Sequence, residues 1–186
     1  DGHYFFDSNS LFDFLELNVN SRYVIKVQYS NGGKGVFDSN SLTSHNKDAL
    51  KKSNRFLVQE FINGYGLTVE GVWDGGNCAG LTVRKTHRFK IPIGGAAVII
   101  EETFDSKAIS ISKELMEKID YRGPAQIEFI IADGEPFLIE VNPRWWGTTP
   151  FNVNIGKDYS NYLLTGEVIA SESFSYAKNI GIWYLG

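Results

Sequence analysis

The sequence predicts an α+β fold that consists mostly of antiparallel hairpins, with two or three helices. Residues 67–86 alternate between apolar and polar side chains on both sides of Asp74-Gly75-Gly76-Asn77, a pattern typical of a β-hairpin. Residues 125–142 alternate in the same way around Asp133 and Gly134. At 186 residues and 42% hydrophobic content, the chain is long enough to bury the core of one or two small lobes.

The remaining elements follow from local patterns along the chain. The first twenty residues suggest an arriving segment and a short amphipathic helix around 10–16, for which Ser10 would be the N-cap. Further strands are expected at 22–27, 36–37 and 55–62, helices at 46–54 and 105–119, and glycine-containing loops at 28–35 and 91–99.

Composition excludes several classes of protein. The net charge of −4 and the pI near 5.4 give no electrostatic reason to bind nucleic acid or an anionic membrane. The sequence contains no apolar run of about 18 residues, the length of a membrane span. The single cysteine, Cys78, cannot form an internal disulfide, so a reducing, cytoplasmic compartment is expected. Because the chain starts at Asp1 and its one methionine is Met116, we expect it to be a piece of a longer protein.

The second hairpin carries polar residues on one face. Its odd positions are apolar on both strands, whereas the even positions include Glu128, Glu140, Asn142 and Arg144. If the apolar faces share one core, paired residues must have matching parity, which predicts an odd-numbered turn of three residues rather than a two-residue Asp-Gly turn. Glu128 and Glu140 then lie on the same face, directly opposed or diagonal.

Two neighbouring carboxylates raise each other's pKa unless a cation lies between them. Oxygen ligands from Glu128, Glu140 and Asn142 suit Mg²⁺, which often shares its coordination shell with substrate phosphates. Pro143 ends hydrogen-bond donation by the strand, so that Arg144 can reach a ligand. The alternative is a solvated face of an antiparallel sheet that carries ordinary surface charges.

The stretch QIEFIIADGEPFLIEVNPRWWG resembles the metal-binding hairpin of the ATP-grasp superfamily, in particular the carbamoyl-phosphate-synthetase-like ligases. The resemblance covers roughly residues 21–168. It implies two lobes of antiparallel sheet with flanking helices that enclose a nucleotide cleft. It also implies that Glu128, Glu140 and Asn142 hold Mg²⁺ (or Mn²⁺) on ATP, and that Arg144 faces the transferring phosphoryl or acyl group.

Two upstream stretches resemble the nucleotide-binding parts of this family. YVIKVQYSNGGKGV resembles the phosphate-binding strand and loop, in which Lys26 would contact the α- and β-phosphates and Gly32, Gly33 and Gly35 would let the backbone approach them. FLVQEFINGYG resembles the adenine-binding hinge. Its lining residues would be Gln59, Glu60, Phe61 and Ile62.

One departure concerns the ribose. Many relatives carry a Glu for the ribose hydroxyls where this chain has Gly66. The next strand, LTVRKTHRFKIPIGG, resembles one that presents basic residues to phosphates and substrate. Arg84, Lys85 and Arg88 are its candidates, and Lys85 is assigned with Arg144 to catalysis. His87 is expected to be structural or on the surface, and Cys78 is not expected to act as a nucleophile. Trp145 and Trp146 are expected to pack the end of the strand.

The domain prediction is a remnant of a preceding domain at 1–20, a small lobe at 21–62 and a large lobe at 63–186. The favoured function is an Mg-ATP-dependent ligase that joins a small carboxylate to an amine or similar nucleophile through an acylphosphate. Its partner would be the missing N-terminal domain or a companion subunit. A non-catalytic nucleotide-binding domain and a module that binds sugars or peptides through its 26 aromatic residues are the alternatives.

Overall fold

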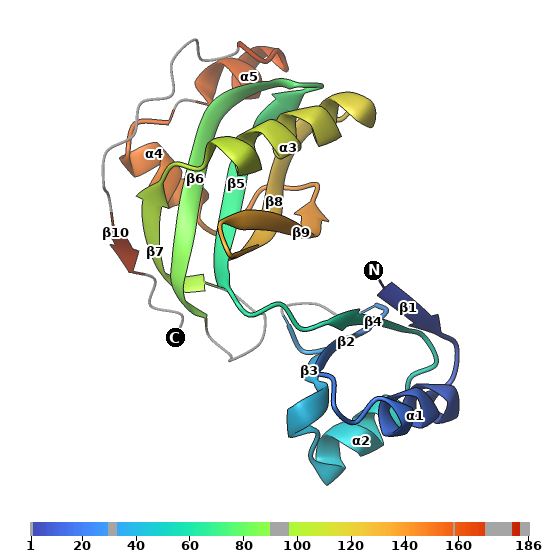
Figure 1. Cartoon of the computed structure of the whole chain (residues 1–186). Helices are drawn as coiled ribbons and strands as arrows, with labels where there is room; N and C mark the ends of the chain where they lie inside the picture. Colours follow the sequence, from blue (N-terminus) through green and yellow to red (C-terminus); the bar gives the residue numbers. More distant parts are fainter. Residues whose placement is uncertain (1, 30–32, 90–96, 158, 170–179, 183–186) are drawn as a thin grey trace. The chain divides into compact units, whose positions relative to one another are not determined.

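The computed structural model describes residues 2–29, 33–89, 97–157, 159–169 and 180–182. These residues form two compact units (Figure 1). Unit 1 contains the described part of 1–62 together with Phe89, and unit 2 contains 63–88 and the described residues from 97 onward. Each unit has an antiparallel sheet with flanking helices, so the predicted α+β class is confirmed.

Unit 1 is a four-stranded sheet covered by helices. The strand order is β1-β4-β2-β3, with bounds Gly2–Phe5, Phe56–Glu60, Tyr23–Val27 and Val36–Asp38. Leu11 of α1 (Ser8–Leu17) and Leu50 of α2 (Ser44–Lys51) are buried against Ile25 and Val58 of the sheet. The helices therefore cover the Ile25 face of unit 1.

The start of the chain differs from the sequence prediction. Residues 1–20 were expected to be a remnant of another domain, but β1 pairs with β4 and α1 contributes to the core of unit 1. The N-cap is Asp7 rather than Ser10, because the Asp7 carboxylate accepts the hydrogen bond of the Ser10 backbone N–H.

Unit 2 is a six-stranded sheet with the strand order β10-β7-β6-β5-β8-β9. Its strands are β5 (Tyr65–Asp74), β6 (Asn77–Phe89), β7 (Ala97–Thr103), β8 (Arg122–Ala132), β9 (Glu135–Asn142) and β10 (Ile180–Ile182). Helix α3 (Ser106–Lys118), capped by Asp105, places Ala108 and Met116 in one apolar cluster with Val69, Ile127 and other side chains from one face of the sheet. That face, called the α3 face below, is the core of the unit.

The turn between β8 and β9 also differs from the prediction. Ala132 pairs with Glu135, so the turn consists of only two residues, Asp133 and Gly134, with φ of 52° and 77°. Positive φ at both positions is typical of a type I′ turn. Matching parity excludes this turn only for a regular β9, and β9 contains a bulge.

A β-bulge restores the parity that the apolar faces require. Phe129 pairs with Leu138, but Glu128 pairs with Glu140, so Ile139 is an extra residue on β9. Near the turn, Leu138 rather than Phe137 is therefore on the side of Phe129, and Phe137 opposes Ile130 instead. Beyond the bulge, Val141 opposes Ile127 as predicted.

Two short helices near the end of the described chain were not predicted. They are α4 (Thr149–Asn154) and α5 (Ser160–Thr165), and Tyr159 between them packs with Trp146 and Val72. No helix in the described ranges is long and apolar enough to span a membrane. The loop at 91–99 falls largely outside the described residues, which resume at β7.

An ion pair in unit 1 connects Arg22, directly before β2, with Asp38 at the end of β3. Both nitrogens Nε and Nη2 of Arg22 donate to the Asp38 carboxylate, the shorter bond being 2.6 Å. The Arg22 hydrogen bonds lower the pKa of Asp38 below its usual range, although burial opposes this effect. Such a carboxylate adds stability that is present above its unfolded pKa and is lost as the pH falls through its folded pKa.

We expect Asp38→Asn to lower the stability of the protein by about 1 kcal/mol at pH 7, since Arg22 is half-exposed and the pair is screened by solvent. Asn retains the oxygen that accepts from the Asn40 backbone, so the change tests the charge. The stability difference between wild type and variant should shrink as the pH falls below about 3.9. The Asp38 carboxyl then protonates, first in the unfolded protein and at lower pH in the folded protein. Urea denaturation across this range measures the effect.

The control is Asp48→Asn, because Asp48 is exposed and pairs only loosely with Lys51. Equal stability losses at Asp38 and Asp48 would contradict the assignment.

Candidate functional site

Two rows of polar side chains cross the face of the unit 2 sheet opposite to α3. Register places Arg84, Thr68, Glu128 and Glu140 in the first row, on β6, β5, β8 and β9 in turn. The second row is Thr82, Glu70, Gln126 and Asn142 on the same four strands. We call this face the polar face. It carries all three predicted metal ligands.

Glu128 and Glu140 are directly paired across β8 and β9, so the prediction that they share a face is confirmed. Glu128 is half-buried and Glu140 is exposed. Burial raises the pKa of Glu128 above its usual range, and the negative charge of Glu140 raises it further. Arg84 and Arg144 act in the opposite direction. The two carboxylates thus form a site of concentrated negative charge, which a cation would relieve.

Asn142 and Arg144 complete this end of the polar face. The Asn142 Nδ2 donates to Glu128 Oε1 at 3.1 Å, and Arg144 Nη2 donates to Asn142 Oδ1 at 3.4 Å. Arg144 follows the end of β9, as the position of Pro143 predicted, and its side chain is exposed. The structure therefore brings Glu128, Glu140, Asn142 and Arg144 together.

The donor set fits a hard divalent cation with an incomplete protein shell. It offers two carboxylates and one amide oxygen, and in the described part of the chain no three His, Cys, Asp or Glu side chains gather as a metal site. Mg²⁺ is commonly bound by one or two carboxylates together with substrate phosphates. The residues thus suit a metal that arrives with a phosphate ligand.

Lys85 lies on the other face of the sheet. It pairs with Leu67, which in turn pairs with Phe129, and both apolar side chains belong to the core cluster on the α3 face. The Lys85 ammonium lies 4.2 Å from the centre of the Tyr65 ring. Arg84, one residue earlier, is in the row of Glu128. Arg84 is thus on the polar face and Lys85 is not, while the side chain of Arg88 is outside the described set.

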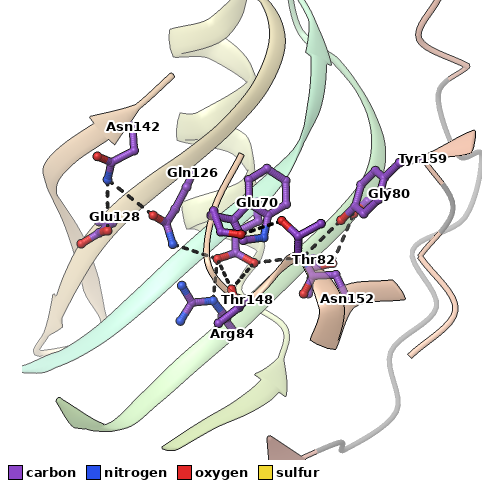
Figure 2. A network of polar contacts seen from close by, with 12 residues as sticks. Glu70, Gly80, Thr82, Arg84, Gln126, Glu128, Asn142, Thr148, Asn152 and Tyr159 are labelled. Carbon is purple, nitrogen blue, oxygen red and sulfur yellow. Dashed lines mark hydrogen bonds and ion pairs between the residues drawn. The ribbon is translucent and has the colours of Figure 1, made fainter. Parts of the chain in front are cut away.

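A buried carboxylate occupies the middle of the polar face. Glu70 is 0% exposed and Arg84 is 4% exposed, and the Arg84 Nε donates to Glu70 Oε1 at 2.6 Å. Gln126, Thr148 and Asn152 donate to the same carboxylate (Figure 2). We call these five residues the Glu70 network. Sequence reasoning did not identify it.

An aromatic group lies on the polar face beyond this network. Trp146 and Tyr159 are buried against Val72, and the Tyr159 hydroxyl donates to the Gly80 carbonyl at 3.2 Å. Burial raises the pKa of Tyr159 above its usual range, which keeps the hydroxyl protonated. Trp146 has the packing role that the sequence predicted. Trp145 is 37% exposed and contacts the rings of Trp146 and Tyr159.

Gly80 permits the ring of Tyr159 to approach the strand. Gly80 has φ of +61° and lies at a bulge, where Glu70 pairs with Thr82 but Val72 pairs with Ala79. A Cβ added at Gly80 would lie 2.3 Å from the Tyr159 ring. A glycine is therefore required here for two independent reasons, the backbone conformation and the close contact.

In unit 1, two of the predicted nucleotide contacts share a face. Ile25 pairs with Val58 on the helix-covered side, so the alternating Lys26 and Gln59 lie on the opposite side of the sheet. Gly35 accepts from the Val27 backbone at 2.8 Å and Gly33 has φ of 76°. Gly32 lies outside the described residues.

The end of β4 leads into the predicted hinge. Glu60 pairs with Tyr23, and the Phe61 backbone N–H donates to the Arg22 carbonyl at 2.8 Å. The Arg22 guanidinium also stacks on the Phe61 ring at 3.5 Å. Phe61 and Ile62 are both half-buried. Arg22 thus holds both the backbone and the ring of Phe61 in place.

Neither Cys78 nor His87 was predicted to be catalytic. Cys78 is buried, and burial raises the pKa of its thiol above the usual range, so it is a poor nucleophile. His87 pairs with Glu101 at 2.7 Å.

Comparison with known proteins agrees with this geometry. The ATP-grasp domain family matches residues 13–148. The chain belongs to the ATP-grasp family. Members of this family are ATP-dependent ligases that use ATP and Mg²⁺.

Individual relatives are distant. A carbamoyl phosphate synthase large chain from Sulfolobus acidocaldarius is 25% identical over 143 residues, which cover 72% of this chain and 14% of the relative. A biotin carboxylase in complex with β-γ-ATP from Campylobacter jejuni has a TM-score of 0.69 at 16% identity, over 92% of this chain and 43% of that one. A phosphoribosylamine–glycine ligase from Thermotoga maritima has a TM-score of 0.65 at 19% identity, over 89% and 49%. The structural likenesses show an ATP-grasp fold.

We expect Gly80→Ala to destabilise this ATP-grasp chain more than Gly134→Ala does. Both substitutions place a Cβ at positive φ, which costs about 1–2 kcal/mol. Only at Gly80 does the Cβ also meet a ring, and such overpacking adds about 1–3 kcal/mol. Gly134 is the matched control because nothing lies within 4 Å of its added Cβ. Denaturant unfolding of both variants measures the difference, and equal losses would show that Tyr159 does not pack on Gly80.

Proposed function

We propose that this chain is the ATP-binding region of a ligase that joins a small carboxylate to an amine or similar nucleophile through an acylphosphate. The observation that carries the proposal is the direct pairing of Glu128 with Glu140, with Asn142 in the adjacent row of the polar face. Family membership supports the reaction type, while the substrates are inferred from the family only at the level of chemical class.

The proposed reaction has two steps. A carboxylate oxygen of the substrate attacks the γ-phosphorus of ATP, the new P–O bond forms and the bond to ADP breaks. The nucleophile then attacks the acyl carbon, and inorganic phosphate leaves. In phosphoryl transfer the protein contributes mainly positioning and charge stabilisation rather than covalent chemistry.

Glu128, Glu140 and Asn142 would hold Mg²⁺ or Mn²⁺. A metal bound there would supply positive charge to the phosphates of ATP. The chain's own cations act on the same groups. We assign Arg144 to the transferring group because it is exposed and contacts Asn142. Arg84 shares the row of Glu128, whereas Lys85 lies on the α3 face. Because Arg84 is 4% exposed and paired with Glu70, we assign it no phosphate contact, only a positive charge that acts on Glu128 from within the polar face.

Residues of unit 1 would bind the rest of the nucleotide. Lys26 is assigned to the α- and β-phosphates, and the backbone at Gly32, Gly33 and Gly35 to the same groups. Gln59, Glu60, Phe61 and Ile62 are assigned to adenine. Support comes from the shared face of Lys26 and Gln59, and from the family match, which includes this stretch.

A second candidate is a non-catalytic nucleotide-binding domain or split subunit. Gly66 favours it, because this residue pairs with Ile130 on β8 and offers no side chain to the ribose. The chain spans 14% of the length of the carbamoyl phosphate synthase that it resembles, so we propose that an N-terminal domain or companion subunit completes the enzyme.

We expect Glu140→Gln to abolish metal-dependent nucleotide binding while leaving the melting temperature of the apo protein unchanged or slightly higher. The substitution removes a metal ligand and also a like-charge repulsion with Glu128, worth about 1 kcal/mol in a hydrated site. Calorimetric titration with ATP, with Mg²⁺ and with EDTA, tests binding.

The matched control is Glu135→Gln, on the same strand but paired with Lys107 at the turn, which should bind normally. A clearly lower apo melting temperature for Glu140→Gln with binding intact would make Glu140 a structural partner of Arg144.

Catalysis is tested on the full-length protein by ADP release. We expect release that depends on both Mg-ATP and a carboxylate acceptor, screened as a panel of small acids with and without amines. Nucleotide binding without acceptor-dependent release from any such mixture would favour the non-catalytic domain.

A further inference from the structure

The Glu70 network connects three separate parts of unit 2 through one carboxylate. Glu70 Oε1 accepts from Arg84 at 2.6 Å, from Gln126 at 2.9 Å and from Thr148 at 3.1 Å. Its Oε2 accepts from Asn152 at 3.0 Å and from Thr148 at 3.3 Å. These donors come from β6, β8 and the segment after β9. The carboxylate is therefore almost saturated with hydrogen bonds.

Stability alone does not account for such a group. A buried ion pair contributes little compared with well-packed apolar side chains, because both charges lose their hydration. The network also leaves Arg84 Nη1 and Asn152 Oδ1 buried without a hydrogen-bond partner among the described residues. What the carboxylate does provide is a fixed orientation for each donor, since it can only accept.

Through these hydrogen bonds Glu70 also orients the next amides in the second row of the polar face, those of Gln126 and Asn142. Because the Gln126 Nε2 donates to Glu70, the Gln126 Oε1 faces the next residue in the row, Asn142, whose Nδ2 lies 3.5 Å away. The Asn142 Nδ2 also donates to Glu128. The amide nitrogen of Asn142 is thus directed toward β8, and its oxygen is directed to the other side, where Arg144 approaches it.

A second branch holds the chain that follows Arg144. Thr148 and Asn152 both donate to Glu70, and both are buried. Figure 2 shows these two residues and Gln126 converging on Glu70. The backbone on either side of the exposed Arg144 is therefore fixed at β9 and at Thr148.

We propose that Glu70 is a positioning residue of the metal site: through Gln126 it sets which atom of the Asn142 amide faces the ligand. The inference rests on the proposed function, because it takes Asn142 as a metal ligand. Glu70 itself does not touch metal or substrate. Without it the Gln126 amide can rotate, and Asn142 then loses one of the two acceptors, Gln126 and Glu128, that direct its nitrogen toward β8.

The test uses two variants and one control in the 186-residue chain. Glu70→Gln removes the charge and allows the Gln126 amide to turn. Gln126→Met keeps the volume of a buried side chain and leaves the Glu70–Arg84 ion pair intact, so it serves if Glu70→Gln fails to fold. The control is Glu102→Gln, which removes another buried carboxylate of unit 2, in an ion pair with Lys157.

The first readout is the side-chain amide signal of Asn142 in ¹⁵N spectra of the apo protein, assigned with Asn142→Asp. We expect this signal to shift or broaden in Glu70→Gln and Gln126→Met and to stay unchanged in Glu102→Gln. The second readout is the Mn²⁺ concentration that half-saturates ADP binding. It should rise about tenfold or more in the two network variants, as is usual when a partner of a metal ligand is removed, and stay unchanged in the control.

The outcomes separate the two proposals. If wild type shows no metal-dependent ADP binding, the proposed function fails and the positioning role fails with it. If wild type binds but the Asn142 signal is unchanged in both network variants, the positioning role alone is overturned. It is also overturned if the signal moves and the Mn²⁺ requirement matches that of Glu102→Gln.

Discussion

The ion pair between Glu70 and Arg84 is the constraint on which the rest of the polar face depends. Two charges removed from water require partners, and the Glu70 carboxylate finds them on three segments at once. These bonds hold β6, β8 and the chain after β9 against β5. The predicted metal ligands lie at the end of the rows so arranged, and the proposed positioning role of Glu70 rests on this arrangement.

Strict alternation is the part of the site that the sequence could predict. Apolar side chains at odd positions of both strands place Glu128 and Glu140 on one face, and the register agrees. The same reasoning applies to β6, where buried Val83 precedes Arg84. Applied there, it would have chosen Arg84 over Lys85 and suggested Glu70, beside the buried Val69, as a partner. The alternation of β5 and β6 thus carries the same information as that of β8 and β9.

Irregular backbone is the part that alternation could not predict. The bulge at Ile139 adds one residue to β9, and a branched apolar residue there gives no local sign of it. Parity alone therefore excluded the two-residue turn that Asp133 and Gly134 form. The sequence did not predict the role of residues 1–20 or the helices α4 and α5 for a different reason. Such short elements are stabilised by contacts with residues far away in the chain, which local patterns do not contain.

The buried charge also explains why the strands keep a single register. A slip of β5 by one residue would turn Glu70 toward the α3 face, where the neighbours of Val69 are the apolar Val83 and Ile127. A carboxylate without donors in that environment costs several kcal/mol, whereas an apolar residue at position 70 would tolerate either register. Glu128 pairs with Thr68 of β5, so in this register it lies on the same face as Glu70 and Arg84. The direct pairing of Glu128 with Glu140 on that face follows from the register of β8 with β9, so the polar face needs both registers to be fixed.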